Sequence, residues 1–75
     1  MVKNHAVTEV VLAKFNKSSD LQTHLRLVEV EGVRVLEFRD FIPSLGEYGR
    51  GYWMSADNRE GLNEVVNALI EVLNG

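Results

Sequence analysis

The sequence predicts an α+β fold in which a four-stranded antiparallel sheet is followed by one C-terminal helix (ββββα), with the subunit pairing as a homodimer. Runs of β-branched and aromatic residues, separated by turn residues, fill positions 7–55. Near the C-terminus the apolar residues change to helical spacing. The chain has 75 residues and no cysteine, so it is small and cannot be stabilised by disulfides. Oligomerisation is then the main remaining way to bury more surface. Residues 1–75 form a single domain, and residues 1–6 are expected to be a frayed N-terminus.

Three strands are predicted in the first part of the chain. Residues 7–15, "VTEVVLAKF", are rich in β-branched residues and lead into the loop "NKSSD". Residues 21–30, "LQTHLRLVEV", alternate between apolar and polar types. Glu31–Gly32 separates this run from "VRVLEFRDF" at 33–41. Two residues ending in glycine predict a tight hairpin, because glycine accepts the positive φ that such turns need.

The fourth strand is predicted at residues 48–55, "YGRGYWMS", which follow a loop around the only proline. The two-residue turn before the third strand also fixes the register of the central hairpin. On one face the opposed pairs are Val30–Val33, Val28–Val35, Arg26–Glu37 and His24–Arg39.

The two faces of the predicted sheet differ in chemistry. One carries an apolar set that the amphipathic helix is expected to cover. Its members are Leu25, Leu27, Leu36 and Phe38, with Val10 and Leu12 added if residues 17–20 form the first loop. The other face is expected to stay open and is basic and aromatic at one end. Its members are Phe15, His24, Arg26, Val28, Val35, Glu37, Arg39 and Phe41.

The helix is predicted by apolar residues at helical spacing from Leu62 to Leu73. Asp57 followed by Glu60 resembles a capping box, Ser55 is a competing N-cap, and Gly75 is a suitable stop. A second apolar strip beside the first suggests a partner subunit, and a helix that is simply apolar is the alternative. The residues expected in the dimer interface are Val65, Ala68, Leu69 and Val72.

The net charge of −3 is unevenly distributed. Residues 1–56 hold seven basic and seven acidic side chains, whereas residues 57–75 hold Arg59 against four acidic side chains. The excess negative charge therefore lies in the C-terminal segment, and the sheet can still present a local positive surface.

The sequence offers little for an enzyme, a metal or a membrane. It has no cysteine, no Gly-x-Ser-x-Gly elbow and no phosphate loop of Walker spacing. Glu37 and Asp40 point to opposite faces in the predicted register, so they do not make a carboxylate pair. We expect no catalysis, no metal and no cofactor. No apolar run approaches a membrane span, so we expect a soluble protein in the cytoplasm, with nucleoid association as one option.

An open sheet face that mixes arginine with aromatic rings suits single-stranded nucleic acid. Cations neutralise phosphates and release counterions, while rings stack on bases of any sequence. The alternative is a protein-interaction or oligomerisation module that buries this face against a partner. No feature of the sequence distinguishes DNA from RNA, since none reports on a 2′-hydroxyl.

The order of these motifs resembles the positive-cofactor-four family of single-stranded-DNA-binding transcriptional coactivators, most closely its small bacterial and phage members. The similar pieces are Phe38–Arg39–Asp40–Phe41, Gly49–Arg50–Gly51 and Met54–Ser55, and the likeness covers about residues 8–74. The resemblance implies a dimer that holds single-stranded DNA on its sheets with little sequence preference. It also implies a role in transcription, replication or repair, with transcription or replication proteins as partners.

By resemblance, Arg39 and Arg50 are expected to contact phosphates. Lys14 and Lys17 are expected near DNA by location rather than by motif. Trp53 departs from the family pattern and is expected either to stack on a base or to fill the dimer interface. The full set expected to bind nucleic acid is Lys14, Phe15, Lys17, His24, Arg26, Arg39, Phe41, Tyr48, Arg50 and Trp53.

Overall fold

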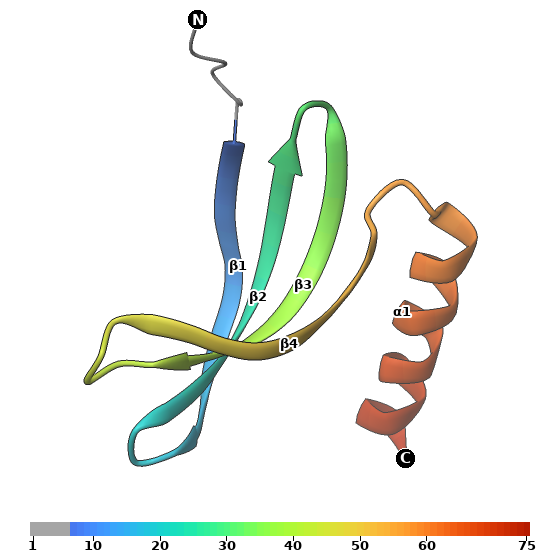
Figure 1. Cartoon of the computed structure of the whole chain (residues 1–75). Helices are drawn as coiled ribbons and strands as arrows, with labels where there is room; N and C mark the ends of the chain where they lie inside the picture. The colour runs from blue at the N-terminus through green and yellow to red at the C-terminus, as the bar shows by residue number, and fades with distance from the viewer. Residues whose placement is uncertain (1–6) are drawn as a thin grey trace, which may run out of the picture.

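The computed structural model describes residues 7–75 as one antiparallel sheet followed by one helix (Figure 1). The strands are β1 (Val7–Ser18), β2 (Leu21–Val30), β3 (Val33–Ile42) and β4 (Glu47–Ser55), and the helix is α1 (Arg59–Asn74). The four strands follow one another across the sheet in the order β1-β2-β3-β4. The predicted ββββα order is confirmed, whereas the predicted frayed terminus at 1–6 lies outside the described residues.

The central hairpin forms as the sequence predicts. Val30 pairs with Val33, and the register continues through Arg26↔Glu37 and His24↔Arg39. Glu31 and Gly32 both have positive φ, at 52° and 81°. Positive φ at both turn residues is the geometry of the primed hairpin turn that matches the twist of the strands.

The first hairpin differs from its prediction. β1 continues to Ser18, so the connection is two residues long rather than spanning 17–20. Register shifts occur between Val11 and Ala13 and again between Asn16 and Ser18. An extra residue in one strand reverses which side chains reach each face. Alternation beyond the first shift is therefore inverted relative to the sequence-based register.

Two faces of the sheet can now be defined by the residues of β2. The inner face carries His24, Arg26 and Val28, and the outer face carries Leu25 and Leu27. Because of the first bulge, Phe15 lies opposite Thr23 on the outer face and Lys14 lies opposite His24 on the inner face. The expectation that Phe15 lies on the basic, open face was wrong.

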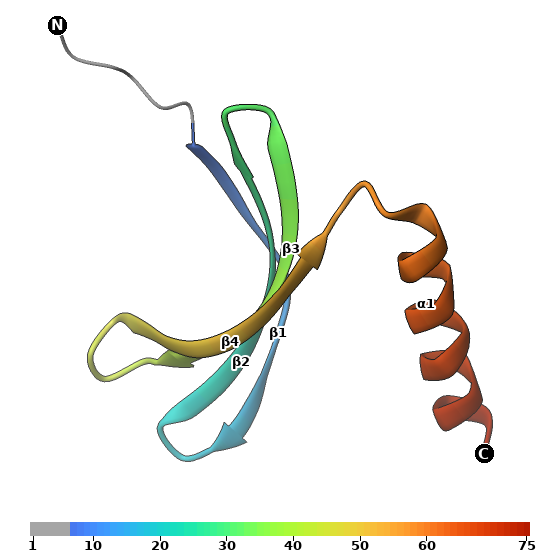
Figure 2. The same ribbon diagram turned by 45° about the vertical axis from the view of Figure 1, so that its right-hand side comes forward.

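The inner face is the better buried of the two. His24, Arg26 and Val28 are the buried residues among those described, and Val28 is the one apolar member. No second layer covers them, so the burial comes from side chains of the neighbouring strands on the curled sheet (Figure 2). The outer apolar set is only half-buried at Leu25, Leu27 and Leu36 and is exposed at Val10, Leu12 and Phe38.

The helix does not cover the sheet of its own chain. No Cα atom of α1 lies within 8 Å of a Cα atom of any strand in the described part of the chain, and the helix stands beside the sheet in both ribbon views (Figures 1 and 2). The expectation that this helix covers Leu25, Leu27, Leu36 and Phe38 within one subunit was therefore wrong. The apolar stripe of α1 is left exposed, including Leu69 at 54%.

The connection between β4 and α1 is held by specific contacts. The backbone N–H of Ala56 donates to the carbonyl of Arg34 over 2.9 Å, and Arg34 Nη1 donates to Asp57 Oδ1 over 2.9 Å. Asn58 is the N-cap, with its side chain accepting from the Gly61 N–H. The N-cap is therefore one residue beyond the predicted Asp57. These contacts fix where the chain leaves β4 and enters α1.

Gly51 allows β4 to approach β3 closely. It pairs with Arg39, and a register shift lies just before it, between Arg39 and Phe41. A Cβ at Gly51 would lie 2.2 Å from the carbonyl oxygen of Phe38 and 2.9 Å from the Cα of Arg39. The obstructing atoms belong to backbone, so a side chain here requires the two strands to separate.

Gly51→Ala is expected to destabilise the fold by roughly 1–3 kcal/mol, the usual cost of overpacking. Gly49→Ala is a matched control, because a Cβ there meets the Cβ of Asp40 at 3.7 Å, an ordinary contact. The measurement is the midpoint of urea unfolding followed by circular dichroism. Equal midpoints for the two variants would contradict the close approach of Gly51 to β3.

Candidate nucleic-acid interface

Cross-strand pairing aligns the predicted binding residues in rows on the inner face. One row runs from Lys14 through His24 and Arg39 to Gly51. The next row contains Arg26, Glu37 and Trp53, and the row on the other side contains Gln22, Phe41 and Tyr48. Eight of the ten predicted positions lie on or around these rows or the adjoining turns, whereas Phe15 and Lys17 lie toward the opposite face.

Arg26 is a buried structural cation rather than an open one. Its Nη1 donates to Glu37 Oε1 over 3.1 Å, and its Nη2 pairs with Glu9. The guanidinium also lies over the ring of Tyr48, 4.2 Å from the centroid. Two carboxylates and an aromatic ring therefore compensate the positive charge of the guanidinium. This compensation explains why a buried arginine is tolerated here. A phosphate cannot reach Arg26 without displacing them.

His24 is likewise enclosed. Its ring stacks on Phe41 with 4.5 Å between centroids, and Tyr48 meets its edge at 5.3 Å. Its two ring nitrogens lie 2.9 Å from the Tyr48 hydroxyl and from Gln22 Oε1. His24, Phe41 and Tyr48 thus form a packed cluster, and their rings are not free platforms for a base.

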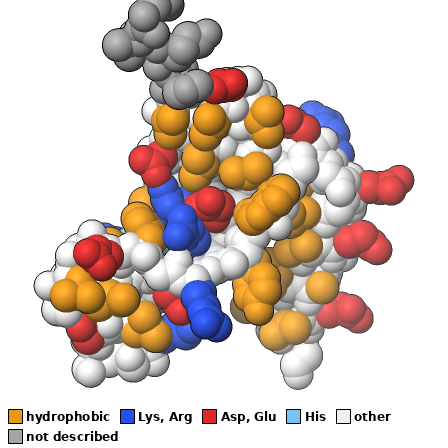
Figure 3. Space-filling view, in the orientation of Figure 1, with side chains coloured by type: hydrophobic (Ala, Val, Ile, Leu, Met, Phe, Trp, Pro, Cys, Tyr) orange, Lys and Arg blue, Asp and Glu red, His pale blue; other side chains and the backbone are white. Residues whose placement is uncertain are grey.

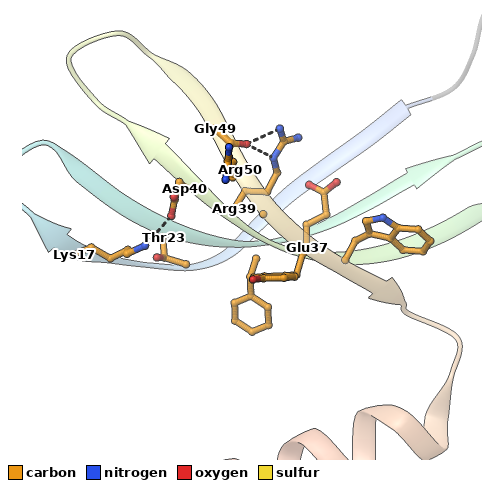
Figure 4. Close-up of a pocket in the computed structure, with 11 residues that line it drawn as sticks. Lys17, Thr23, Glu37, Arg39, Asp40, Gly49 and Arg50 are labelled. Atoms are coloured by element: carbon orange, nitrogen blue, oxygen red, sulfur yellow. Dashed lines mark hydrogen bonds and ion pairs between the residues drawn. The ribbon is translucent and has the colours of Figure 1, made fainter.

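Arg39 combines a structural contact with a partly open charge. Its Nε and Nη2 donate to the carbonyl of Gly49 over 3.3 and 2.9 Å, bridging β3 to the bulged part of β4 (Figure 4). Its Nη1 has no partner among residues 7–75, and the residue is half-buried. A guanidinium fixed in this way still presents donors at a defined place.

Arg50 and Trp53 are the open groups of the site. Arg50 is exposed and pairs with nothing in the described part of the chain, and Trp53 is 70% exposed. Tyr52, between them, points to the outer face opposite Phe38 and is 84% exposed. Trp53 points to the inner face opposite Glu37, and Tyr52 is left largely uncovered in the described part of the chain. Tyr52 lines the pocket but was absent from the predicted site. Its place next to Gly51 in the sequence could have indicated it.

The two lysines lie in different surroundings. Lys14 is exposed on the inner face beside His24. Lys17 donates to Asp40 Oδ1 over 3.1 Å and remains 46% exposed. Figure 4 shows Lys17 with Asp40 on the side of the sheet away from the Arg39 guanidinium. An exposed pair of this kind is weak, but Lys17 lies on the wrong side of the sheet to exchange Asp40 for a phosphate at the inner face.

An open pocket of about 830 Å³ joins several of these residues at the β3–β4 edge. Its charged and aromatic lining consists of Lys17, Glu37, Phe38, Arg39, Asp40, Arg50, Tyr52 and Trp53. In the space-filling view, Lys and Arg side chains lie near the middle of the molecule, next to acidic side chains and between hydrophobic ones (Figure 3). The site therefore has cations and rings in reach of one another.

The described residues contain no group of His, Cys, Asp or Glu placed to hold a metal ion. Within the same range, no helix has the length and apolar character needed to cross a membrane. Comparison of the chain with protein-family models, with curated proteins and with solved structures found no match.

Proposed function

We propose that this protein binds single-stranded nucleic acid, foremost DNA, as a homodimer and with little sequence specificity. The observation that carries the proposal is the exposure of Arg50 and Trp53 on one edge strand, beside the bridged guanidinium of Arg39. Cations at such a site neutralise phosphates, and an exposed ring stacks on a base. Oligomers of both DNA and RNA are used in the test, because no feature of the sequence reports on a 2′-hydroxyl.

The roles of the predicted residues divide into contacts and scaffold. Lys14, Arg39 and Arg50 contact phosphates and Trp53 stacks on a base, whereas Lys17 stays with Asp40 on the other side of the sheet. The scaffold residues hold the curled sheet that presents them. They are His24, Arg26, Phe41 and Tyr48.

The homodimer is supported by how little one chain buries. Val28 is the one buried apolar residue among those described, and no residue of α1 is buried. A folded domain normally gains its stability from apolar burial that offsets chain entropy. A single chain with this little apolar burial lacks the main source of folding stability, and it has no disulfide to compensate.

The second copy supplies a suitable cover for both bare surfaces. The outer face of the sheet and the stripe of α1 are each apolar, and they belong to one chain in which they do not meet. We propose that α1 of each copy packs against the outer face of the other, with Val65, Ala68, Leu69 and Val72 in the interface. Such an exchange is self-complementary, as a two-fold interface must be. The inner-face site then remains open on each subunit.

The test is titration of the single tryptophan with single- and double-stranded oligonucleotides at several salt concentrations. We expect quenching by single strands, and an association constant whose logarithm falls with log salt at a slope of about −2 to −3 per site, since each phosphate contact contributes about −0.7. Double strands are expected to bind more weakly, because their bases are not free to stack.

Arg50→Ala is expected to lower the steepness of that salt dependence by about 0.7, because one phosphate contact is lost. Arg59→Ala is the matched control, since Arg59 begins α1 and lies away from the pocket. The measurement is the slope of log affinity against log salt for each variant. Equal slopes for the unaltered protein and both variants would show that Arg50 does not contact a phosphate.

Absence of quenching and of affinity for any oligonucleotide at low salt would contradict nucleic-acid binding altogether. A dimer with that result would be an oligomerisation or protein-interaction module, the alternative that the sequence leaves open. The titration therefore separates the two functions directly.

A further inference from the structure

Glu37 is an acidic residue in a pocket otherwise suited to phosphates. It lines the same pocket as Arg39, Arg50 and Trp53, and it is the cross-strand partner of Trp53. Side chains of directly opposed residues have Cβ atoms about 4.5–5.5 Å apart. A carboxylate at this place repels phosphate. Next to the exposed ring, it is suited to accept a hydrogen bond from a neutral donor group of the ligand.

The carboxylate of Glu37 is fixed in direction by one hydrogen bond, and its second oxygen is still able to accept another. Its Oε1 accepts from the buried Arg26, and its side chain is 18% exposed. No partner of Oε2 exists among residues 7–75. Figure 4 shows the Glu37 side chain and the Arg39 guanidinium projecting to the same side of the sheet, above the strand that they share. Glu37 therefore presents one open acceptor atom close to Trp53.

We propose that Glu37 reads the base that stacks on Trp53, by accepting a hydrogen bond from an exocyclic amino group. This inference rests on the proposed function. Cytosine and adenine offer such an amino group at N4 and N6, and guanine offers one at N2. Uracil and thymine present carbonyl oxygens in the corresponding places, and these repel a carboxylate. The site thus prefers amino-bearing bases at one position of an otherwise sequence-tolerant strand.

The experiment compares oligomers of deoxycytidine and deoxyuridine of equal length, which differ at position 4 (amino against carbonyl) and in the hydrogen that uracil carries on N3, without the complication of a methyl group. With the intact protein, we expect the deoxycytidine oligomer to bind about tenfold more tightly, the size of one good hydrogen bond to a charged group. Trp53 fluorescence reports both titrations. Glu37→Gln is expected to reduce the preference to about twofold or less, because an amide both donates and accepts.

Two further measurements guard against a general effect of the substitution on the fold. Glu47→Gln, an exposed acid at the start of β4, is expected to keep the full preference. An oligomer of N4,N4-dimethyldeoxycytidine, tested on the unaltered protein, is expected to bind as weakly as the deoxyuridine oligomer, because it has no amino hydrogen to donate.

The outcomes separate this inference from the function on which it rests. Equal affinity for the deoxycytidine and deoxyuridine oligomers, with quenching by both, overturns the role of Glu37 and leaves single-strand binding in place. Tight binding of the dimethylated oligomer also overturns it. Failure of every oligomer to bind overturns both.

Discussion

Leu69→Asp is expected to abolish the dimer and, with it, the cooperative unfolding transition of the protein. Leu69 lies on the apolar stripe of α1 and is 54% exposed in the single chain, so a charge there costs little unless a second chain covers it. Removing a large buried side chain costs about 2–5 kcal/mol, and two-fold symmetry applies the change twice. A loss of that size is comparable to the whole stability of a small domain.

The measurements are sedimentation equilibrium and thermal unfolding, both as a function of protein concentration. The unaltered protein is expected to sediment as two chains and to melt at higher temperature as its concentration rises. Asn67→Asp introduces the same charge on the polar side of α1 and is expected to leave both properties unchanged. A monomeric, cooperatively folding Leu69→Asp protein would contradict the exchange of helices.

Trp53→Ala is expected to weaken binding to single strands by about fivefold to 150-fold, corresponding to the roughly 1–3 kcal/mol that one stacked base contributes. The ring is 70% exposed and therefore buries little surface within its own chain, so its loss is not expected to destabilise the fold. Because Trp53 is the only tryptophan, this variant is followed by anisotropy of a labelled oligonucleotide.

Leu45→Ala is the matched control for that experiment. Leu45 is an exposed apolar residue in the β3–β4 turn, outside the pocket, and its truncation is expected to leave affinity unchanged. Unchanged affinity of Trp53→Ala, together with a blue-shifted tryptophan emission in the free protein, would instead place the ring in the dimer interface. That result would favour the other role that the sequence allows for Trp53.

Much of the local structure follows from the sequence by itself. Alternating runs and a two-residue turn ending in Gly32 predict three strands and the register from Val30↔Val33 to His24↔Arg39, because side-chain alternation and turn length leave one pairing. The change to helical spacing after Asp57 predicts α1, and the cap was misplaced by one residue. Arg50 was predicted as a site residue by resemblance and Trp53 as a departure from the same pattern, and both are exposed in β4.

The tertiary structure decided which of these side chains are available. The bulge between Val11 and Ala13 moves Phe15 to the outer face, and no residue pattern in β1 indicates a bulge at that place. Curling of the sheet buries His24 and Arg26, since enclosure depends on side chains of three neighbouring strands at once. α1 stands apart from the sheet of its own chain, a placement that its apolar spacing does not reveal. Periodicity tells which side of a helix is apolar, and the path of the chain in space determines what that side can meet.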